Sequence, residues 1–302
     1  MFNGNGFMLT LGEYIYPEVA YLKVIIDGKK SSRFAVVNGK ERIIVEGLSN
    51  SCHTVEILKI TESDVPVLFD SLILFGEEVA LGCRPADKRN RIEFIGDSIT
   101  AGYGVLAKNT ECAYNTYQQD GTNSYAYLTA QKLGADARYI CISGKGIVCN
   151  CEGNYSDVKT GEYYNRQTRV GGVCNDGWEP HVVVLNIATN DACGNAKTEE
   201  FVPAAKDILQ KLRARYKDAE IIWAYGAMTH RFMKEIRAVV RELNKTDKKI
   251  HFLPIESIEG KPQEIGAAGH PNVVASIRVA KCLSRKIRSL EFWKNISVCD
   301  KL

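Results

Sequence analysis

The stretch Arg91-Ile-Glu-Phe-Ile-Gly-Asp-Ser-Ile-Thr-Ala-Gly-Tyr-Gly104 decides the fold of this chain. Its apolar run, residues 92–95, predicts a short buried strand that Gly96 ends. Ser98 follows directly, and open α/β sheets bind their ligands at the carboxyl ends of their strands. Taken alone, the pattern also fits an ordinary strand-to-loop turn that happens to hold a serine. It indicates a nucleophile only if the rest of the chain supplies a base and donors for an oxyanion.

Strands and helices alternate after this stretch. We expect strands at 138–143, 182–187, 221–225 and 250–255, and helices at 123–133, 198–216, 232–243 and 272–284, the last with an extension to 290 left open. The continuous apolar run at 182–187 is typical of a strand buried on both faces. This alternation predicts a parallel five-stranded sheet with helices on both faces. The long polar segment 149–180 has the length of a functional or mobile loop.

The first 85 residues follow a different pattern. Short apolar runs at 21–27, 34–37, 43–45, 53–60 and 68–75 are separated by turn residues. The pair Asn38-Gly39 is the strongest short hairpin signal among them. This spacing predicts a small all-β sandwich or jelly roll, followed by a polar linker at 85–90. We therefore expect two domains, an all-β domain at 1–88 and an α/β domain at 89–302.

Composition excludes several classes of protein. The 302 residues are 45% apolar and 25% charged, which is ordinary for a soluble globular protein. The net charge of +3, with no basic stripe interleaved with aromatics, argues against nucleic acid as a partner. No apolar run reaches the roughly 18 residues of a membrane span. The first residues show no signal-peptide pattern, so the expectation is either a secreted protein that has lost its leader or a cytoplasmic one.

Ten cysteines are present, and half of them fall in one middle stretch: Cys141, Cys149, Cys151, Cys174 and Cys193. No two CxxC pairs occur together, so we expect no zinc site. A chain of this length does not need disulfides to stabilise its core. We therefore favour mostly free thiols, with one or two bridges as the alternative.

Three further residues follow expected strands. Gly144 follows the second strand, Asn190 the third and His270 the fifth. Because parallel strands end at one edge of the sheet, these loops are expected to gather around Ser98. A serine needs an adjacent base, and His270 can take its proton and return it to a leaving alcohol. The backbone N–H groups of Ser98 and Gly144 and the amide of Asn190 can bind the oxyanion.

Each of these residues has a simpler interpretation. Gly144 also fits a turn glycine, and Gly146 is its rival as the amide donor. Asn190 with Asp191 also fits a helix-capping turn, and His270 also fits the residue before a Pro-Asn helix start. Their joint occurrence, in order and at the ends of strands, favours one shared site.

Gly96-Asp97-Ser98, Gly144, Asn190 and His270 resemble the four sequence blocks of the SGNH (GDSL-type) hydrolases. With the preceding β region, including His53-Thr-Val-Glu56, the chain resembles carbohydrate esterase family 2. Those enzymes join a jelly roll to an SGNH domain and remove acetyl groups from plant polysaccharides. The resemblance implies a flavodoxin-like, three-layer catalytic domain that uses no metal and no cofactor.

Some positions depart from the family pattern. Ala267 stands three residues before the histidine, where most SGNH enzymes have aspartate. Similarity to family 2 therefore implies a Ser98–His270 dyad, with a main-chain carbonyl holding the imidazole and no catalytic role for Glu264. Ala188 stands where the family usually has glycine, and we expect this to be a mild change.

The residue before the histidine is a second departure. Gly269 stands where many relatives carry an aromatic residue, which puts sugar stacking at this position in doubt. Trp178, in the long loop, is the candidate replacement for binding substrate. Its alternative interpretation is a hydrophobic anchor for that loop.

The sequence thus predicts a serine esterase that removes O-acetyl groups from hemicellulose or oligosaccharide through an acyl-enzyme. Its expected partner is the acetylated carbohydrate, and the sequence makes no prediction of an oligomeric state. One alternative is an SGNH lipase, lysophospholipase or thioesterase acting on acyl chains. The other is a non-catalytic carbohydrate-binding protein.

Overall fold

The computed structural model describes residues 1–13, 18–37, 41–62, 67–82, 90–109, 113–166, 172–174 and 176–293. The chain divides into two compact units, Met1–Asp87 with Asn115–Gln119, and Lys88–Tyr114 with Asp120–Leu302. The domain boundary expected at residues 88 and 89 lies outside the described residues. Nothing in the sequence pattern indicates that Asn115–Gln119 belongs with the first unit.

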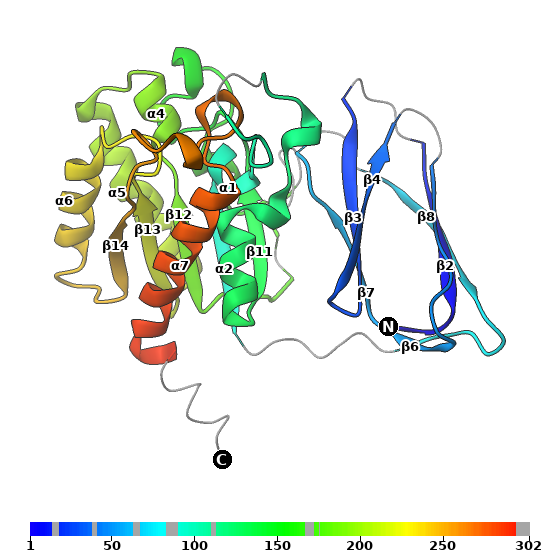
Figure 1. The fold of residues 1–302 in the computed structure, drawn as a ribbon. Coiled ribbons are helices and arrows are strands. Elements are labelled where there is room, and N and C mark those ends of the chain that lie inside the picture. Colours follow the sequence, from blue (N-terminus) through cyan, green and yellow to red (C-terminus); the bar gives the residue numbers. More distant parts are fainter. Residues whose placement is uncertain are drawn as a thin grey trace. The chain divides into compact units, whose positions relative to one another are not determined.

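The first unit is all-β, as expected. It contains three antiparallel sheets. The first has the order β6 (Ser51–His53), β1 (Phe2–Gly4) and β9 (Ala80–Leu81), and the second has the order β5 (Arg42–Val45), β2 (Gly6–Leu11) and β8 (Phe69–Phe75). The third has the order β4 (Lys30–Val36), β3 (Ala20–Ile26) and β7 (Val55–Lys59). The second and third sheets face each other within this unit (Figure 1). Alternate residues of β2 and β3, such as Leu9 and Leu22, fill the core between them.

The hairpin expected at Asn38-Gly39 is wrong. β4 pairs with β3 across the turn that contains Asp27 and Gly28, whereas β5 pairs with β2 in another sheet. The chain therefore crosses between the two layers after β4, and residues 38–40 themselves lie outside the described part. An Asn-Gly pair favours a turn through its local backbone preferences, but burial of apolar faces decides which strands pair.

The segment Asn115–Gln119 is held in the first unit by Arg33 of β4. The Nη2 atom of Arg33 donates to the carbonyl oxygens of Thr116 (3.3 Å) and Gln119 (3.0 Å). Its guanidinium also lies 4.0 Å from the ring centre of Tyr21 and 4.9 Å from that of Tyr117. One arginine thus satisfies two carbonyls and makes two cation–π contacts.

The second unit contains a parallel sheet in the order β11-β10-β12-β13-β14. The strands are β10 (Arg91–Gly96), β11 (Asp136–Cys141), β12 (Val182–Asn186), β13 (Glu220–Tyr225) and β14 (Ile250–Pro254). All four neighbouring pairs are parallel. This is the flavodoxin-like order, in which ligands bind beside the first strand where the winding reverses. The expected five-stranded α/β fold is confirmed.

Helices cover both faces of this sheet (Figure 1). One face carries α2 (Tyr125–Leu133) and α7 (Val273–Ser289), and the other carries α5 (Thr198–Arg215) and α6 (Met233–Leu243). The shorter elements of this unit are α1 (Ser98–Ala101), α3 (Thr160–Tyr163), α4 (Thr189–Cys193), η2 (Gly121–Asn123), η3 (Cys151–Gly153), η4 (Pro262–Glu264) and η5 (Ala267–Gly269), whereas η1 (Thr116–Gln118) belongs to the first unit. Strand β10 contributes to the apolar core on both faces of the sheet. Phe94 packs with α2 and α7 on one face, and Ile95 packs with α5 and α6 on the other.

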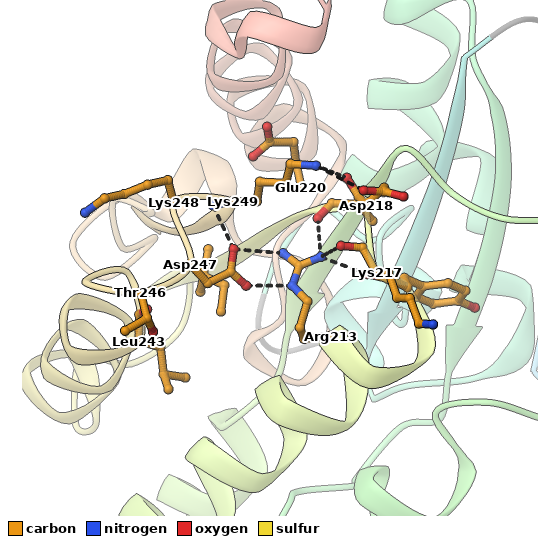
Figure 2. Close-up of polar contacts among 12 residues, drawn as sticks. Arg213, Lys217, Asp218, Glu220, Leu243, Thr246, Asp247, Lys248 and Lys249 are labelled. Atoms are coloured by element: carbon orange, nitrogen blue, oxygen red, sulfur yellow. Dashed lines mark hydrogen bonds and ion pairs between the residues drawn. The ribbon is translucent and has the colours of Figure 1, made fainter.

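Arg213 fixes the amino-terminal edge of this sheet. Its Nε atom lies 2.6 Å from Asp247 Oδ2, and its Nη1 atom donates to the carbonyl oxygens of Tyr216, Lys217 and Ala219. Figure 2 shows the guanidinium between Asp247 and the turn that leads into β13. The arginine thereby joins the end of α5 to the loop before β14, at the edge opposite the carboxyl ends of the strands.

Candidate active site

Ser98 is placed by the sharp turn that ends β10. A Cβ atom at Gly96 would overlap Thr100, so the turn requires glycine there. The Asp97 side chain then accepts the N–H of Ile99 at 3.0 Å and caps α1, which Ser98 begins. The serine is 5% exposed. The strand and its cap therefore hold Ser98 at the carboxyl edge of the sheet in one orientation.

His270 is brought to the serine by a loop more than 170 residues further along the chain. Its Nε2 atom lies 2.9 Å from Ser98 Oγ, and its Nδ1 atom lies 3.1 Å from the carbonyl oxygen of Ala268. An Nδ1–H that donates to this carbonyl leaves Nε2 as the acceptor for the serine hydroxyl. Burial lowers the pKa of His270, against the opposing effect of the nearby carbonyls.

The loop that carries His270, residues 266–272 (the histidine loop), is hydrogen-bonded to the loop that follows α1. The N–H of Ala267 donates to Gly104 O at 3.2 Å, and the N–H of Val273 donates to Val105 O at 3.1 Å. Gly104 has φ +65°, and a Cβ there would lie 2.8 Å from Ala267 O. A glycine is therefore needed where the two loops meet.

Tyr103 is an aromatic neighbour of His270 that the sequence analysis did not single out. The two ring centres are 4.6 Å apart, and the ring of Tyr114 also stacks on Tyr103. The signal was available, because Tyr103 lies between two glycines immediately after the serine turn. Its ring restricts the imidazole and shields it from water.

The structure distinguishes the two glycines proposed as amide donors. The N–H of Gly146 donates to Asn150 Oδ1 at 3.1 Å, and a Cβ there would overlap Cys149 O. Gly144 has φ +77°, and among the described residues its N–H has no hydrogen-bond partner. The N–H of Ser98 is likewise unpaired within the described part of the chain. These two amides are available to an oxyanion, whereas that of Gly146 is not.

Asn190 lies on α4, directly after β12, and is buried. Its Nδ2 atom donates to Lys145 O at 3.0 Å and makes a longer contact of 3.4 Å with Asp97 Oδ2. An amide nitrogen carries two protons, so the shorter bond fixes one and leaves the other weakly held. Asn190 is thus tied both to the Gly144 loop and to the serine turn.

Asp191 is a second residue that the sequence analysis did not assign to the site. Its carboxylate accepts the N–H groups of Ile147, Val148 and Cys149 at 2.7–3.1 Å. Burial raises the pKa of Asp191, although these amides oppose that shift. A carboxylate next to Asn190 was visible in the sequence, but its three amide partners depend on the folded loop. Asp191 holds the loop after Gly144 against α4.

Ala188 adopts a conformation that disfavours a side chain. Its φ is +101° with ψ −6°, at the position just before α4. Non-glycine residues in this region are strained. The expectation that alanine is a mild change here is therefore corrected, because the backbone position is one that favours glycine.

Glu264 does not contact the imidazole. Its carboxylate accepts three hydrogen bonds from Arg278 of α7, at 2.8 and 3.1 Å from Nε and at 2.6 Å from Nη2. Its carbonyl oxygen accepts the N–H of Asn272, which caps α7. Glu264 therefore joins the histidine loop to α7.

Trp178 is not brought into the candidate site. Its ring lies 4.3 Å from the guanidinium of Arg138, and it stands four residues before β12 begins. This position is toward the amino ends of the strands, whereas Ser98 lies at their carboxyl ends. A cavity of about 260 Å³ near that amino edge, lined by Arg91, Glu179, Pro180, His181, Tyr216, Lys217, Asp218, Ala219, Glu220, Lys249 and Phe292, is also separate from the site. The placement of Trp178 agrees with its alternative interpretation as an anchor of the long loop.

Two kinds of structural feature are absent from the described residues. Among them, no group of three or more histidine, cysteine, aspartate or glutamate side chains is arranged to hold a metal ion. Across the same residues, no helix has the length and apolar character needed to cross a bilayer.

The fold and the four strand-end residues are typical of one protein family. Residues 94–274 match the model of the GDSL-like Lipase/Acylhydrolase family, and the chain belongs to this family. Residues 1–81 match the carbohydrate esterase 2 N-terminal model. The chain is therefore an SGNH protein of carbohydrate esterase family 2, and the resemblance found in the sequence is confirmed.

Similar proteins include Cellulase/esterase CelE of Acetivibrio thermocellus, which is 28% identical over 90% of this chain and 34% of its own length. An acetylxylan esterase / glucomannan deacetylase of Cellvibrio japonicus is 29% identical over 72% of this chain and 57% of its own length. The chain thus spans about a third and just over half of these two relatives. A family two carbohydrate esterase from Clostridium thermocellum, solved with cellohexaose, is 27% identical with a TM-score of 0.88, covering 97% of this chain and 91% of that one.

Proposed function

We propose that this protein is a serine esterase that removes O-acetyl groups from carbohydrate, either hemicellulose or oligosaccharide. The observation that carries the proposal is the 2.9 Å contact between Ser98 Oγ and His270 Nε2. The names of two relatives, which describe acetylxylan and glucomannan deacetylation, support the substrate class. The acetylated carbohydrate is then the partner of the site.

Acylation begins when Ser98 attacks the acetyl carbonyl. His270 takes the hydroxyl proton on Nε2, and the new imidazolium keeps its Nδ1–H bond to Ala268 O. The resulting oxyanion accepts hydrogen bonds from the N–H groups of Ser98 and Gly144 and from the Asn190 amide. His270 then returns its proton to the sugar oxygen, and the C–O bond to the sugar breaks.

Deacylation repeats the same steps with water. His270 removes a proton from water, which attacks the acetyl group on Ser98. The same three donors stabilise the second oxyanion, and the serine leaves with the proton that His270 holds. Acetate is released and the dyad returns to its starting state. Among the described residues, no carboxylate is hydrogen-bonded to the imidazole, so we propose a dyad of Ser98 and His270.

Labelling of Ser98 tests the nucleophile. A fluorophosphonate probe should modify the protein on Ser98, and Ser98→Ala should remove the label. His270→Ala should slow labelling strongly, because the hydroxyl loses its base. Absence of labelling in the unchanged protein would favour the non-catalytic carbohydrate-binding alternative.

A series of nitrophenyl esters tests the acyl group. Acetyl needs only a small pocket, whereas a lipase, lysophospholipase or thioesterase needs room for a long chain. We expect the highest kcat/KM with acetate and a steady fall as the chain lengthens. A maximum at about eight carbons or more would favour the acyl-chain alternative instead. Acetylated xylan, glucomannan and monosaccharides then distinguish the sugar.

A further inference from the structure

Two thiols lie beside the proposed oxyanion donors. Cys151 Sγ and Cys193 Sγ are 2.9 Å apart, although 42 residues separate them in the chain. Cys151 begins η3, and Cys193 is the last residue of α4. All seven cysteines in the described residues are free thiols, so this pair is unbridged in the structure.

Each cysteine is directly connected to a proposed donor. The N–H of Cys151 donates to the carbonyl oxygen of Gly144 at 2.9 Å. Cys193 follows Asn190 by three residues on the same short helix. A bond between the two sulfurs would therefore join the turn that presents the Gly144 amide to the helix that presents the Asn190 side chain.

The two segments are in close contact beside the two cysteines. A Cβ at Gly194 would overlap Asn150 O, so glycine is required immediately after Cys193. Cys149, the nearest other cysteine in the same loop, is fully buried and its Sγ lies near Gly194 O and Asn150 O. Its thiol is turned to carbonyl groups, whereas that of Cys151 is turned to Cys193.

We propose that Cys151 and Cys193 form an intramolecular disulfide under oxidising conditions, and that this bond locks the Gly144 and Asn190 segments of the oxyanion hole together. The formation of the bond is independent of the proposed esterase activity. Only its effect on turnover rests on that proposed function.

The order of the exchange follows from exposure. Cys193 is exposed, whereas Cys151 is half-buried and its pKa is raised to about 11, first by burial and then by Cys193. The exposed Cys193 sulfur therefore attacks a small disulfide such as oxidised glutathione, and its proton leaves with one glutathione thiol. The Cys151 thiol loses its proton and attacks Cys193 Sγ, which releases the second glutathione. Two electrons and two protons pass from the protein thiols to the small disulfide.

Peptide mapping tests whether the bond forms. The full chain is incubated with oxidised glutathione or with dithiothreitol, alkylated under denaturing conditions and digested without reduction. After oxidation we expect one linked peptide pair containing Cys151 and Cys193, which is absent from the dithiothreitol sample and from Cys193→Ser. Cys52→Ser, which changes an exposed cysteine of the first unit, should keep the linked pair. Recovery of both Cys151 and Cys193 in alkylated form after oxidation would overturn the proposal.

Thermal unfolding and steady-state kinetics test the locking role. Closing a loop of 42 residues should raise Tm by roughly 5–10 °C in the oxidised protein. On reduction, kcat should fall by about threefold or more while KM changes little, because oxyanion donors act mainly in the transition state. Cys193→Ser and Cys151→Ser should lose this sensitivity to reductant, and Cys52→Ser should keep it.

The two proposals fail in different ways. A linked peptide with no change in Tm or kcat on reduction would overturn the locking role. A linked peptide with the expected Tm shift, in a protein that deacetylates no substrate, would overturn the esterase proposal and leave the disulfide intact.

Discussion

The Nδ1 atom of His270 lies 3.1 Å from the carbonyl oxygen of Ala268, two residues earlier in the same loop. Ala268 itself has a positive φ of +50°, so the loop holds a mildly unfavourable conformation at the residue that orients the imidazole. A neutral carbonyl replaces the usual carboxylate in this role. The nearby carboxylate of Glu264 is instead bound by Arg278.

Replacing Glu264 should therefore affect stability more than catalysis. For Glu264→Ala we expect kcat/KM to stay nearly unchanged, while Tm falls because Arg278 loses the nearer of its two acidic partners and keeps only Glu256 at 3.6 Å. Steady-state kinetics and thermal unfolding measure the two effects, and Glu264→Gln serves as the variant of matched size. A loss of kcat/KM above roughly 100-fold, or about 2.7 kcal/mol, would contradict the dyad.

The pH dependence of turnover should reflect the shielding of His270. Burial lowers the pKa of His270, and only the neutral imidazole can accept the serine proton. We expect kcat/KM to be constant at neutral pH and to fall below an apparent pKa that is lower than the ordinary histidine value of about 6.5. Acetate release measured across pH gives this value.

Tyr103 provides the control for that pH profile. Tyr103→Ala removes the ring that lies 4.6 Å from the imidazole and admits water. The acid limb should then move up toward the ordinary histidine pKa. An acid limb above pH 7 in the unchanged protein would show that burial does not set the histidine pKa.

Asn190 should stabilise the transition state and contribute little to substrate binding. Asn190→Ala removes one proposed oxyanion donor, and such a loss costs about 10²–10³ in kcat. We expect KM to change by less than about threefold, because the donor contributes little to the ground state. Circular dichroism checks that α4 is intact. A variant that keeps more than a third of the original kcat would remove Asn190 from the oxyanion hole.

Replacing Ala188 with glycine should stabilise the protein. Ala188 has φ +101°, where a Cβ is unfavourable by about 1–3 kcal/mol. Glycine relieves this strain but increases the entropy of the unfolded chain, which leaves a net gain of about 1 kcal/mol. Chemical denaturation of Ala188→Gly measures the gain, with Ala192→Gly inside α4 as a control that should destabilise. Equal losses in both variants would contradict strain at residue 188.

Glu93 should make stability depend on pH. It is buried in β10, where burial raises its pKa from 4.5 to about 7 and Tyr216 donates to its Oε1 atom at 3.0 Å. A raised pKa in the folded state contributes stability that is fully present below about pH 4.5 and is lost as pH rises through 7. Glu93→Gln should therefore match the unchanged protein near pH 4.5 and exceed it at pH 8, by at most ~3 kcal/mol.

Urea denaturation at both pH values tests this difference. Glu162→Gln, an exposed position on α3, is the control and should change stability equally little at each pH. If Glu93→Gln shifts the free energy of unfolding by the same amount at pH 4.5 and pH 8, Glu93 does not titrate in this range.

The sequence by itself determined the order of elements in the second unit and the strand-end residues proposed for its candidate site, but not Tyr103 or Asp191. Strands such as β12 are continuous apolar runs, and helices such as α7 have a clear period, so local patterning is enough to place them. Parallel strands share one carboxyl edge, and this geometry converts Ser98, Asn190 and His270 from distant positions into neighbours.

Tertiary structure alone decided which groups are free to act. Gly144 and Gly146 look alike in the sequence, but only folding shows that Asn150 occupies the amide of Gly146. The strain at Ala188 and the pairing of β4 with β3 are likewise visible only in the folded chain. Hydrogen-bond partners, backbone angles and strand pairing depend on contacts between residues far apart in the chain, and local sequence carries no record of those contacts.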